Sequence, residues 1–139
     1  MARIMAFDYG NKRVGVAVTD PMQIIATGLD TIHPEKLFDF VKNYIKTEPV
    51  ELFVIGEPRQ MDNSPSEITP QIVGFMRKLK KLFPEIPHER VDERFTSVMA
   101  QQTMIMGGAS KKQRRDKGKI DTISATIILQ SYLERKSFL

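Results

Sequence analysis

The chain opens with Ile4-Met5-Ala6-Phe7-Asp8-Tyr9-Gly10-Asn11-Lys12-Arg13-Val14-Gly15-Val16-Ala17-Val18, in which two apolar, β-rich runs flank a short polar turn. This pattern predicts a β-hairpin. Asp8 lies near the end of the first strand, where an uncompensated buried carboxylate would cost several kcal/mol. Either Asp8 accepts backbone N–H bonds within the turn, or it belongs to a metal or phosphate site. The second interpretation requires further acids from elsewhere in the chain.

Length and composition indicate a single globular domain spanning residues 1–139. The composition, 41% hydrophobic and 27% charged, excludes the membrane and disordered classes. No cysteine and only two histidines are present, which argues against thiolate nucleophiles and the usual zinc sites. No apolar stretch approaches the ~18 residues of a membrane span, and the first residues lack an apolar signal region. We therefore expect a cytoplasmic protein without a membrane partner.

Five strands are predicted from the apolar runs. Residues 4–10, 14–18 and 24–32 follow one another without an intervening helix, which is typical of an antiparallel meander. The continuous apolar run 52–56 is typical of a central strand in a parallel sheet, and residues 89–93 form a short strand that ends in acids. The sheet is therefore expected to be mixed, with three antiparallel strands followed by parallel crossover strands.

Helical spacing of apolar residues separates these later strands. One helix is expected to open at His33-Pro34, and a second to begin at about Thr69, because Pro70 would break a helix that started earlier. A further helix capped by Thr96 and a last helix over 120–135 complete the chain. The order is β-β-β-α-β-α-β-α, in which the final α stands for both closing helices, and the fold is α/β with helices on both faces of the sheet and no domain boundary.

Acids from three separate parts of the sequence are expected to converge on this sheet. Asp8 lies on the central strand, Asp92 and Glu93 lie at the carboxyl end of the last strand, and Asp121 begins a helix laid across the sheet. Hard cations such as Mg²⁺ and Mn²⁺ prefer carboxylate oxygen, and two of them about 4 Å apart can support phosphodiester hydrolysis. The joint placement of the acids favours a metal site.

Each acid also has a simpler explanation when it is considered alone. Asp121 would complement the dipole of its helix, and Glu93 would form a strand-end ion pair with Arg90 or Arg94.

Four segments, in order along nearly the whole chain, resemble the YqgF/RuvX family of ribonuclease H-like nucleases. They are Phe7–Asp20, Ile55–Asp62, the Asp-Glu-Arg segment Asp92–Ser97, and the closing helix 119–133. The resemblance implies a ribonuclease H-like fold and a nuclease that processes the 5′ end of precursor 16S ribosomal RNA. An older assignment for the family is Holliday-junction resolution.

The same resemblance implies an acidic cluster of Asp8, Glu93 and Asp121 that holds one or two Mg²⁺ or Mn²⁺ ions. Asp92 is a neighbour, and the choice between Asp92 and Glu93 as the metal ligand stays open. The chain departs from the family pattern at Glu57, which could join the cluster, and at Phe95-Thr96-Ser97 in place of the commoner Leu-Thr-Thr. Neither departure removes a proposed ligand.

A net charge of +4 and a sequence pI of about 9.4 favour polyanionic partners. Residues 109–119 form a basic stretch without apolar periodicity, which predicts a loop that either contacts phosphates or is simply solvated. Other cations lie beside the proposed metal site and would either hold phosphates or pair with nearby acids. The candidate nucleic-acid contacts are Lys12, Arg13, Arg94, Lys111, Lys112, Arg114, Arg115, Lys117 and Lys119.

Two classes of function are compatible with this sequence. One is a metal-dependent nuclease acting on precursor rRNA or on branched DNA, and the other is a non-catalytic nucleic-acid or ribosome-binding factor on the same fold. The sequence leaves open RNA against DNA as the substrate, and monomer against homodimer as the assembly. A junction resolvase would need two symmetric sites and therefore a dimer.

Overall fold

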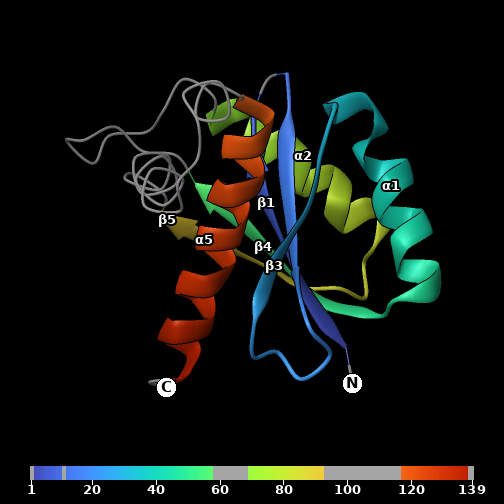
Figure 1. Cartoon of the computed structure of the whole chain (residues 1–139). Coiled ribbons are helices and arrows are strands. Elements are labelled where there is room, and N and C mark those ends of the chain that lie inside the picture. Colours follow the sequence, from blue (N-terminus) through green and yellow to red (C-terminus); the bar gives the residue numbers. More distant parts are fainter. Residues whose placement is uncertain (1, 11, 58–68, 93–116, 138–139) are drawn as a thin grey trace.

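Five strands and three helices are formed by the residues that this computed structural model describes, namely 2–10, 12–57, 69–92 and 117–137. Their order is the predicted β-β-β-α-β-α-β-α (Figure 1). The elements are β1 (Arg3–Tyr9), β2 (Val14–Thr19), β3 (Ala26–Ile32), α1 (Pro34–Thr47), β4 (Val50–Glu57), α2 (Thr69–Leu82), β5 (His88–Asp92) and α5 (Lys117–Ser137).

The strands form one mixed sheet in the order β3-β2-β1-β4-β5, with β1 in the middle. β1 pairs antiparallel with β2, and β2 pairs antiparallel with β3. On its other side β1 pairs parallel with β4, which pairs parallel with β5. The predicted mixed sheet is therefore confirmed, and β4 is an interior strand as its continuous apolar run indicated.

Helices cover both faces of the sheet, with α1 and α2 on one side and α5 on the other (Figure 1). The alternation of β1 separates the two cores, because successive side chains of a strand point to opposite faces. Met5 and Phe7 pack with the residues of α1 and α2, whereas Ile4 and Ala6 pack with those of α5. Both cores are apolar, and β1 is buried from two sides.

The starts of α1 and α2 are confirmed. Nδ1 of His33 accepts a hydrogen bond from the Glu35 N–H at 3.2 Å, and Pro34 occupies the first turn, where its missing N–H leaves no bond unmade. α2 begins at Thr69, with Pro70 in its first turn. In α5 the buried side chains include Ala125, Ile128 and Tyr132, whose spacing of three or four residues puts them on one side of the helix.

Two predicted boundaries were wrong. The third strand begins at Ala26 rather than Ile24, because the N–H groups of Ile24 and Ile25 both bond the Asp20 carboxylate in the preceding turn. The last helix begins at Lys117, so the end of the predicted basic loop is helical. The N–H groups of a first turn need no partner inside the helix, which allows Gly118 there. The predicted helix after Thr96 lies outside the described residues.

Asp20 closes the β2–β3 turn with its side chain. Its Oδ1 accepts hydrogen bonds from the N–H groups of Ile24 and Ile25, both at 2.8 Å, and its Oδ2 accepts one from Met22 at 3.1 Å. These bonds, that from Ile25 foremost, lower the pKa of the Asp20 carboxyl below its ordinary value of 3.8. Gln23 in the same turn adopts the left-handed conformation, with φ of 59°.

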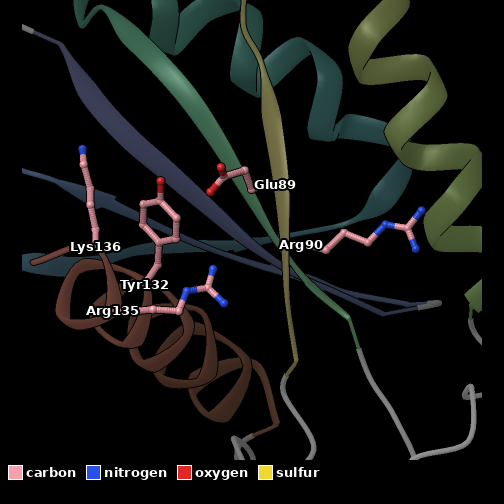
Figure 2. Close-up of a pocket in the computed structure, with 5 residues that line it drawn as sticks. All are labelled: Glu89, Arg90, Tyr132, Arg135 and Lys136. Atoms are coloured by element: carbon pink, nitrogen blue, oxygen red, sulfur yellow. The ribbon is translucent and has the colours of Figure 1, made fainter. Parts of the chain in front are cut away.

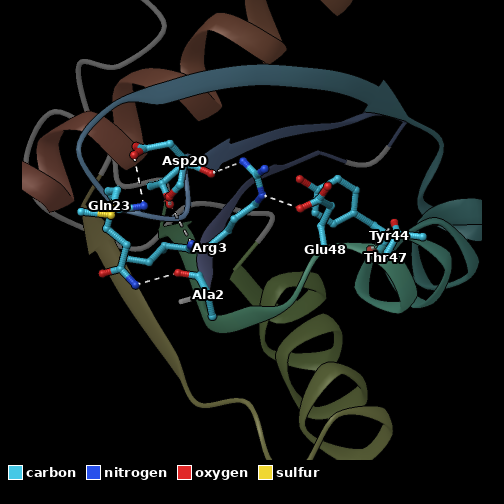
Figure 3. Close-up of polar contacts among 10 residues, drawn as sticks. Ala2, Arg3, Asp20, Gln23, Tyr44, Thr47 and Glu48 are labelled. Atoms are coloured by element: carbon cyan, nitrogen blue, oxygen red, sulfur yellow. Dashed lines mark hydrogen bonds and ion pairs between the residues drawn. The ribbon is translucent and has the colours of Figure 1, made fainter.

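The turn is tied to the first residues of β1 and, through them, to the end of α1. Gln23 Nε2 donates to the Ala2 carbonyl at 2.9 Å, and the Arg3 guanidinium donates to the Thr19 carbonyl at 2.9 Å (Figure 3). Arg3 also forms an ion pair with Glu48 at 3.1 Å. These contacts fix one end of the sheet, opposite to the end where Asp8 lies. In the ranges that the structure describes, no helix has both the length and the apolar character needed to cross a bilayer.

We predict that Asp20→Ala lowers the thermal midpoint by a few degrees at pH 7, because three turn N–H groups lose their acceptor. Since the folded-state pKa is lowered, the ionised carboxylate stabilises the fold above the unfolded pKa of 3.8, and this contribution is lost as the pH falls through the folded value. Thermal midpoints measured from pH 2 to 7 should differ between the wild type and Asp20→Ala at neutral pH and become equal at acidic pH. A difference between the two midpoints that stays constant over this pH range would contradict the prediction.

Candidate metal and nucleic-acid site

Asp8 is the penultimate residue of β1, the middle strand of the sheet, as predicted. It continues the alternation of Ile4 and Ala6, and therefore belongs to the face that α5 covers. The residue is half-buried, while the four residues before it are fully buried. The structure thus presents a carboxylate at the point where the apolar core of this face ends.

Glycines lie beside Asp8 on both neighbouring strands. Gly15 of β2 is paired directly with Asp8. On the other side Phe7 is paired with Ile55, so Gly56 of β4 is level with Asp8. Because glycine has no side chain, neither neighbouring strand covers the Asp8 carboxylate at this level. The two glycines thus contribute no side chain to this level of the α5 face, and both are themselves buried.

The same row of the sheet extends to Thr31, which is paired with Gly15. The Thr31 hydroxyl is hydrogen-bonded to the hydroxyl of Thr122 on α5. The row Asp8–Gly15–Thr31 crosses two strand spacings, or about 10 Å. Since Asp121 immediately precedes Thr122, its backbone is held above the same face and the same end of the sheet as Asp8.

Close packing on β3 fixes α5 in this position. A Cβ atom on Gly28 would lie 2.6 Å from Cγ2 of Thr122 and 3.1 Å from Oγ1 of Thr126. Thr126 in turn donates a hydrogen bond to the Thr122 carbonyl at 2.9 Å. A side chain at position 28 would therefore push the helix away from the sheet.

The other candidate acids approach the site from the parallel strands. Glu57 and Asp92 are the last residues of β4 and β5 and are paired with each other. Parallel strands end at the same edge of a sheet, so both backbones lie at the edge near Asp8. Glu93 follows Asp92 and is outside the described residues, as are the side chains of Glu57, Asp92 and Asp121. The convergence of the three acids therefore stays a prediction.

Some of the candidate nucleic-acid contacts lie in the described residues, and the others lie outside them. Lys12 is exposed and Arg13 half-buried in the turn that follows β1, which is closed by a hydrogen bond from the Gly10 N–H to the Arg13 carbonyl at 2.9 Å. Both lie at the Asp8 end of the sheet. Lys117 and Lys119 belong to the first turn of α5. The remaining candidates, Arg94, Lys111, Lys112, Arg114 and Arg115, lie outside the described residues.

The position of Asp8 fits a divalent cation. Its carboxylate offers the oxygen donor that Mg²⁺ and Mn²⁺ prefer, and the flanking glycines place no side chain beside it. Among side chains that the structure describes, no three acids or histidines are grouped closely enough to hold a metal. Of the proposed ligands, only Asp8 has a side chain that the structure describes, so this finding does not test the cluster of Asp8, Glu93 and Asp121.

Sequence reasoning missed the residues that shape this site without carrying charge. Gly15 and Gly56 interrupt β-rich runs, and a glycine inside a strand is a recognised sign of close approach by a ligand or another backbone. That signal was present in the sequence. The bond between Thr31 and Thr122 had no such signal, because it joins residues far apart in the chain.

Comparison with known families decides the relationship of this chain. The family model described as "RuvX: Holliday junction resolvase" matches residues 2–135. The chain belongs to this family. The resemblance inferred from the four sequence segments is thereby confirmed.

Relatives of similar length match over almost the whole chain. A "Putative pre-16S rRNA nuclease" of Phocaeicola vulgatus is 55% identical over 139 residues, covering 100% of both proteins. A protein of the same name from Bacteroides fragilis is 57% identical over 136 residues, covering 98% of this chain and 99% of the relative.

Solved structures extend the likeness to more distant proteins. "T. thermophilus RuvC in complex with Holliday junction substrate" superposes with a TM-score of 0.57 at 14% identity, covering 98% of this chain and 96% of that one. A second structure of RuvC from Thermus thermophilus gives a TM-score of 0.54 at 13% identity, with coverage of 97% and 96%. This likeness shows that the fold of the RuvX-family chain is ribonuclease H-like.

We predict that Gly28→Ala destabilises the protein by roughly 1–3 kcal/mol, because its methyl group would overlap Thr122. The matched control is Gly74→Ala in α2, where an added Cβ meets nothing within 4 Å. There alanine should stabilise the helix by about 0.5–1 kcal/mol. Urea denaturation gives the free energy of unfolding of both variants. If Gly28→Ala and Gly74→Ala changed it equally and in the same direction, the close packing of α5 on β3 would be contradicted.

Proposed function

We propose that this RuvX-family chain is a metal-dependent nuclease that hydrolyses phosphodiester bonds at the 5′ end of precursor 16S rRNA, in the cytoplasm, during ribosome biogenesis. The observation that carries the proposal is the register of the sheet. Asp8 and Thr31 lie in one row on the face of α5, and the bond from Thr31 to Thr122 holds the backbone of Asp121 over that face. Asp8, Glu93 and Asp121 would hold one or two Mg²⁺ or Mn²⁺ ions.

Two further findings support this function. The curated relatives that match the full chain carry the name of a pre-16S rRNA nuclease. The carboxyl ends of β1, β4 and β5 share one edge, so the chain leaves β5 for Glu93 at the edge where Asp8 lies. Both findings favour carboxylates that act together rather than three separate structural acids.

A bound divalent cation would supply charge stabilisation at the phosphate and a water of lowered pKa. The chain's own residues set the geometry. β1 is buried on both faces, so it fixes the Asp8 carboxylate against a rigid strand. Gly15 and Gly56 place no side chain beside Asp8 on either neighbouring strand.

Lys12 and Arg13 would bind and orient the incoming strand. Both follow β1 directly, and their positive charges lie at the Asp8 end of the sheet, where the phosphates must enter. Contacts of this kind position the backbone without reading its sequence. The choice of RNA substrate therefore depends on other groups.

We predict that Asp8→Asn lowers Mg²⁺-dependent cleavage of a precursor 16S rRNA 5′ fragment by at least about 100-fold, because it removes a negative metal ligand. The matched control is Asp39→Asn on the exposed face of α1, which should keep full activity. Without divalent cations, the thermal midpoint of Asp8→Asn should equal or exceed that of the wild type, because a repulsive charge is removed.

A four-way DNA junction of matched length provides the second substrate. Cleavage of the rRNA fragment but not of the junction supports the proposed substrate, and the reverse result would assign the chain to junction resolution. Titration with Mn²⁺ completes the test. A protein that binds rRNA tightly but binds no Mn²⁺, with Asp8→Asn indistinguishable from wild type, would be a non-catalytic binding factor, and the proposal would fail.

A further inference from the structure

Two pockets adjoin β5, one on the α5 face of the sheet and one on the α2 face. The first is a cavity of about 470 Å³ between β5 and the last turns of α5, lined by Glu89, Arg90, Tyr132, Arg135 and Lys136 (Figure 2). The second, of about 290 Å³, lies between β5 and α2 and is lined by Val73, Met76, Arg77, Lys80, His88 and Arg90. Asp8, the candidate metal ligand whose side chain the structure describes, lines neither pocket.

Arg90 is common to both pockets. Its side chain leaves β5 on the side opposite to Tyr132 and Arg135 and extends toward α2, whereas Glu89 lies on the side of α5 (Figure 2). β5 is the last strand of the described sheet on this side. Arg90 therefore connects the two pockets around the edge of the sheet.

The lining of the two pockets is strongly basic. We define the β5-edge strip as Arg77, Lys80, Arg90, Arg135 and Lys136. Against these five cations, the described residues of the two linings include one acid, Glu89. The whole chain carries a net charge of only +4, so positive charge is concentrated at this edge.

Four of the five cations of the strip are without an acidic partner among the described residues. In the part of the chain that the structure describes, Arg77, Lys80, Arg135 and Lys136 form no ion pair. Lys136 donates to the neutral amide oxygen of Gln23 at 3.0 Å, which positions the ammonium group without neutralising it.

Tyr132 gives the strip a rigid support. Its ring is 8% exposed, and the Arg135 guanidinium lies 5.8 Å from the ring centroid, within the range of a cation–π contact. Burial, and then a hydrogen bond with Glu89, raise the pKa of the Tyr132 hydroxyl above 10.0. The hydroxyl thus stays protonated at neutral pH and donates to the Glu89 carboxylate, which occupies the one acid of the lining.

We propose that the β5-edge strip binds the backbone phosphates of the nucleic-acid substrate at a distance from the cleaved bond. The proposal rests on the proposed nuclease function for the identity of the partner. Cations on both sides of β5 suit an extended polyanion, because a single phosphate could not contact both pockets. Arg side chains with fixed positions are also suited to bidentate phosphate contacts.

The length of α5 sets the span of this contact. Arg135 follows Asp121 by fourteen residues, which corresponds to about 21 Å along a helix. At about 3.4 Å per step, phosphates at Arg135 would lie roughly six base pairs of a duplex away from Asp121, whereas Arg90, paired with Ile55 and through it level with Phe7, lies two strand spacings from β1. The strip would therefore favour substrates with a duplex stem beside the cleavage point.

The test compares two variants with the same loss of charge. Arg90→Gln/Arg135→Gln/Lys136→Gln removes three charges of the strip, and Lys36→Gln/Lys42→Gln/Lys46→Gln removes three exposed charges of α1, far from β5 (Figure 1). Each variant is titrated against a fluorescein-labelled RNA duplex of twenty base pairs in EDTA, from 50 to 200 mM KCl. Anisotropy gives the Kd at each salt concentration.

For the strip variant we expect a Kd raised at least about tenfold at 100 mM KCl and a log–log salt slope reduced by about two to three, with the control within about twofold of wild type. Equal losses in both variants, or an unchanged slope for the strip variant, would overturn the proposal. If the triple variant unfolds, Arg90→Gln/Lys136→Gln keeps the contact of Arg135 with Tyr132 and should still reduce the slope.

This readout separates the strip from the nuclease. Binding is measured without metal, so the strip can be confirmed even if Asp8→Asn shows that the proposed cleavage is wrong. Conversely, metal-dependent cleavage by wild type together with unchanged binding by the strip variant would refute the strip alone. A DNA duplex of the same length serves as a second probe, and a similar loss of affinity for DNA supports contacts to the phosphate backbone.

Discussion

The pairing of β1 on both of its edges is the constraint on which the rest of the structure depends. β1 joins an antiparallel half of the sheet, β2 and β3, to a parallel half, β4 and β5. It is covered by α1 and α2 on one face and by α5 on the other, so its apolar residues contribute to both cores. A carboxylate near the end of such a strand is held in a fixed direction, because neither the strand nor its neighbours can shift without disturbing both cores.

α5 connects the surroundings of this carboxylate to the β5-edge strip. The first turns of the helix are fixed over β3 by Gly28 and by the bond between Thr31 and Thr122. Its last turns pack Tyr132 beside β5, next to the cations of the β5-edge strip. One rigid helix thus spans the distance between the candidate metal site and the strip, so a nucleic acid bound to both would be aligned along it.

The same fold also explains why the comparisons differ in what they establish. Relatives at 55–57% identity align over almost the whole chain, whereas RuvC shares the architecture at 14% identity. The backbone frame requires only apolar alternation and a few glycines at points of close approach. The choice of substrate depends on surface charges, which the frame leaves free to change.

The sequence by itself determined the elements and their order, because hairpin turns, helix caps and apolar periodicity act between residues close together in the chain. It placed Asp8 near the end of a buried strand and Pro34 in a first helical turn, and the structure confirms both. Only the tertiary structure decided that Gly15 and Gly56 flank Asp8, that Thr122 meets Thr31, and that Arg90 joins two basic pockets. These relations depend on strand register and helix docking, which arise from packing between distant segments and leave no local pattern in the sequence.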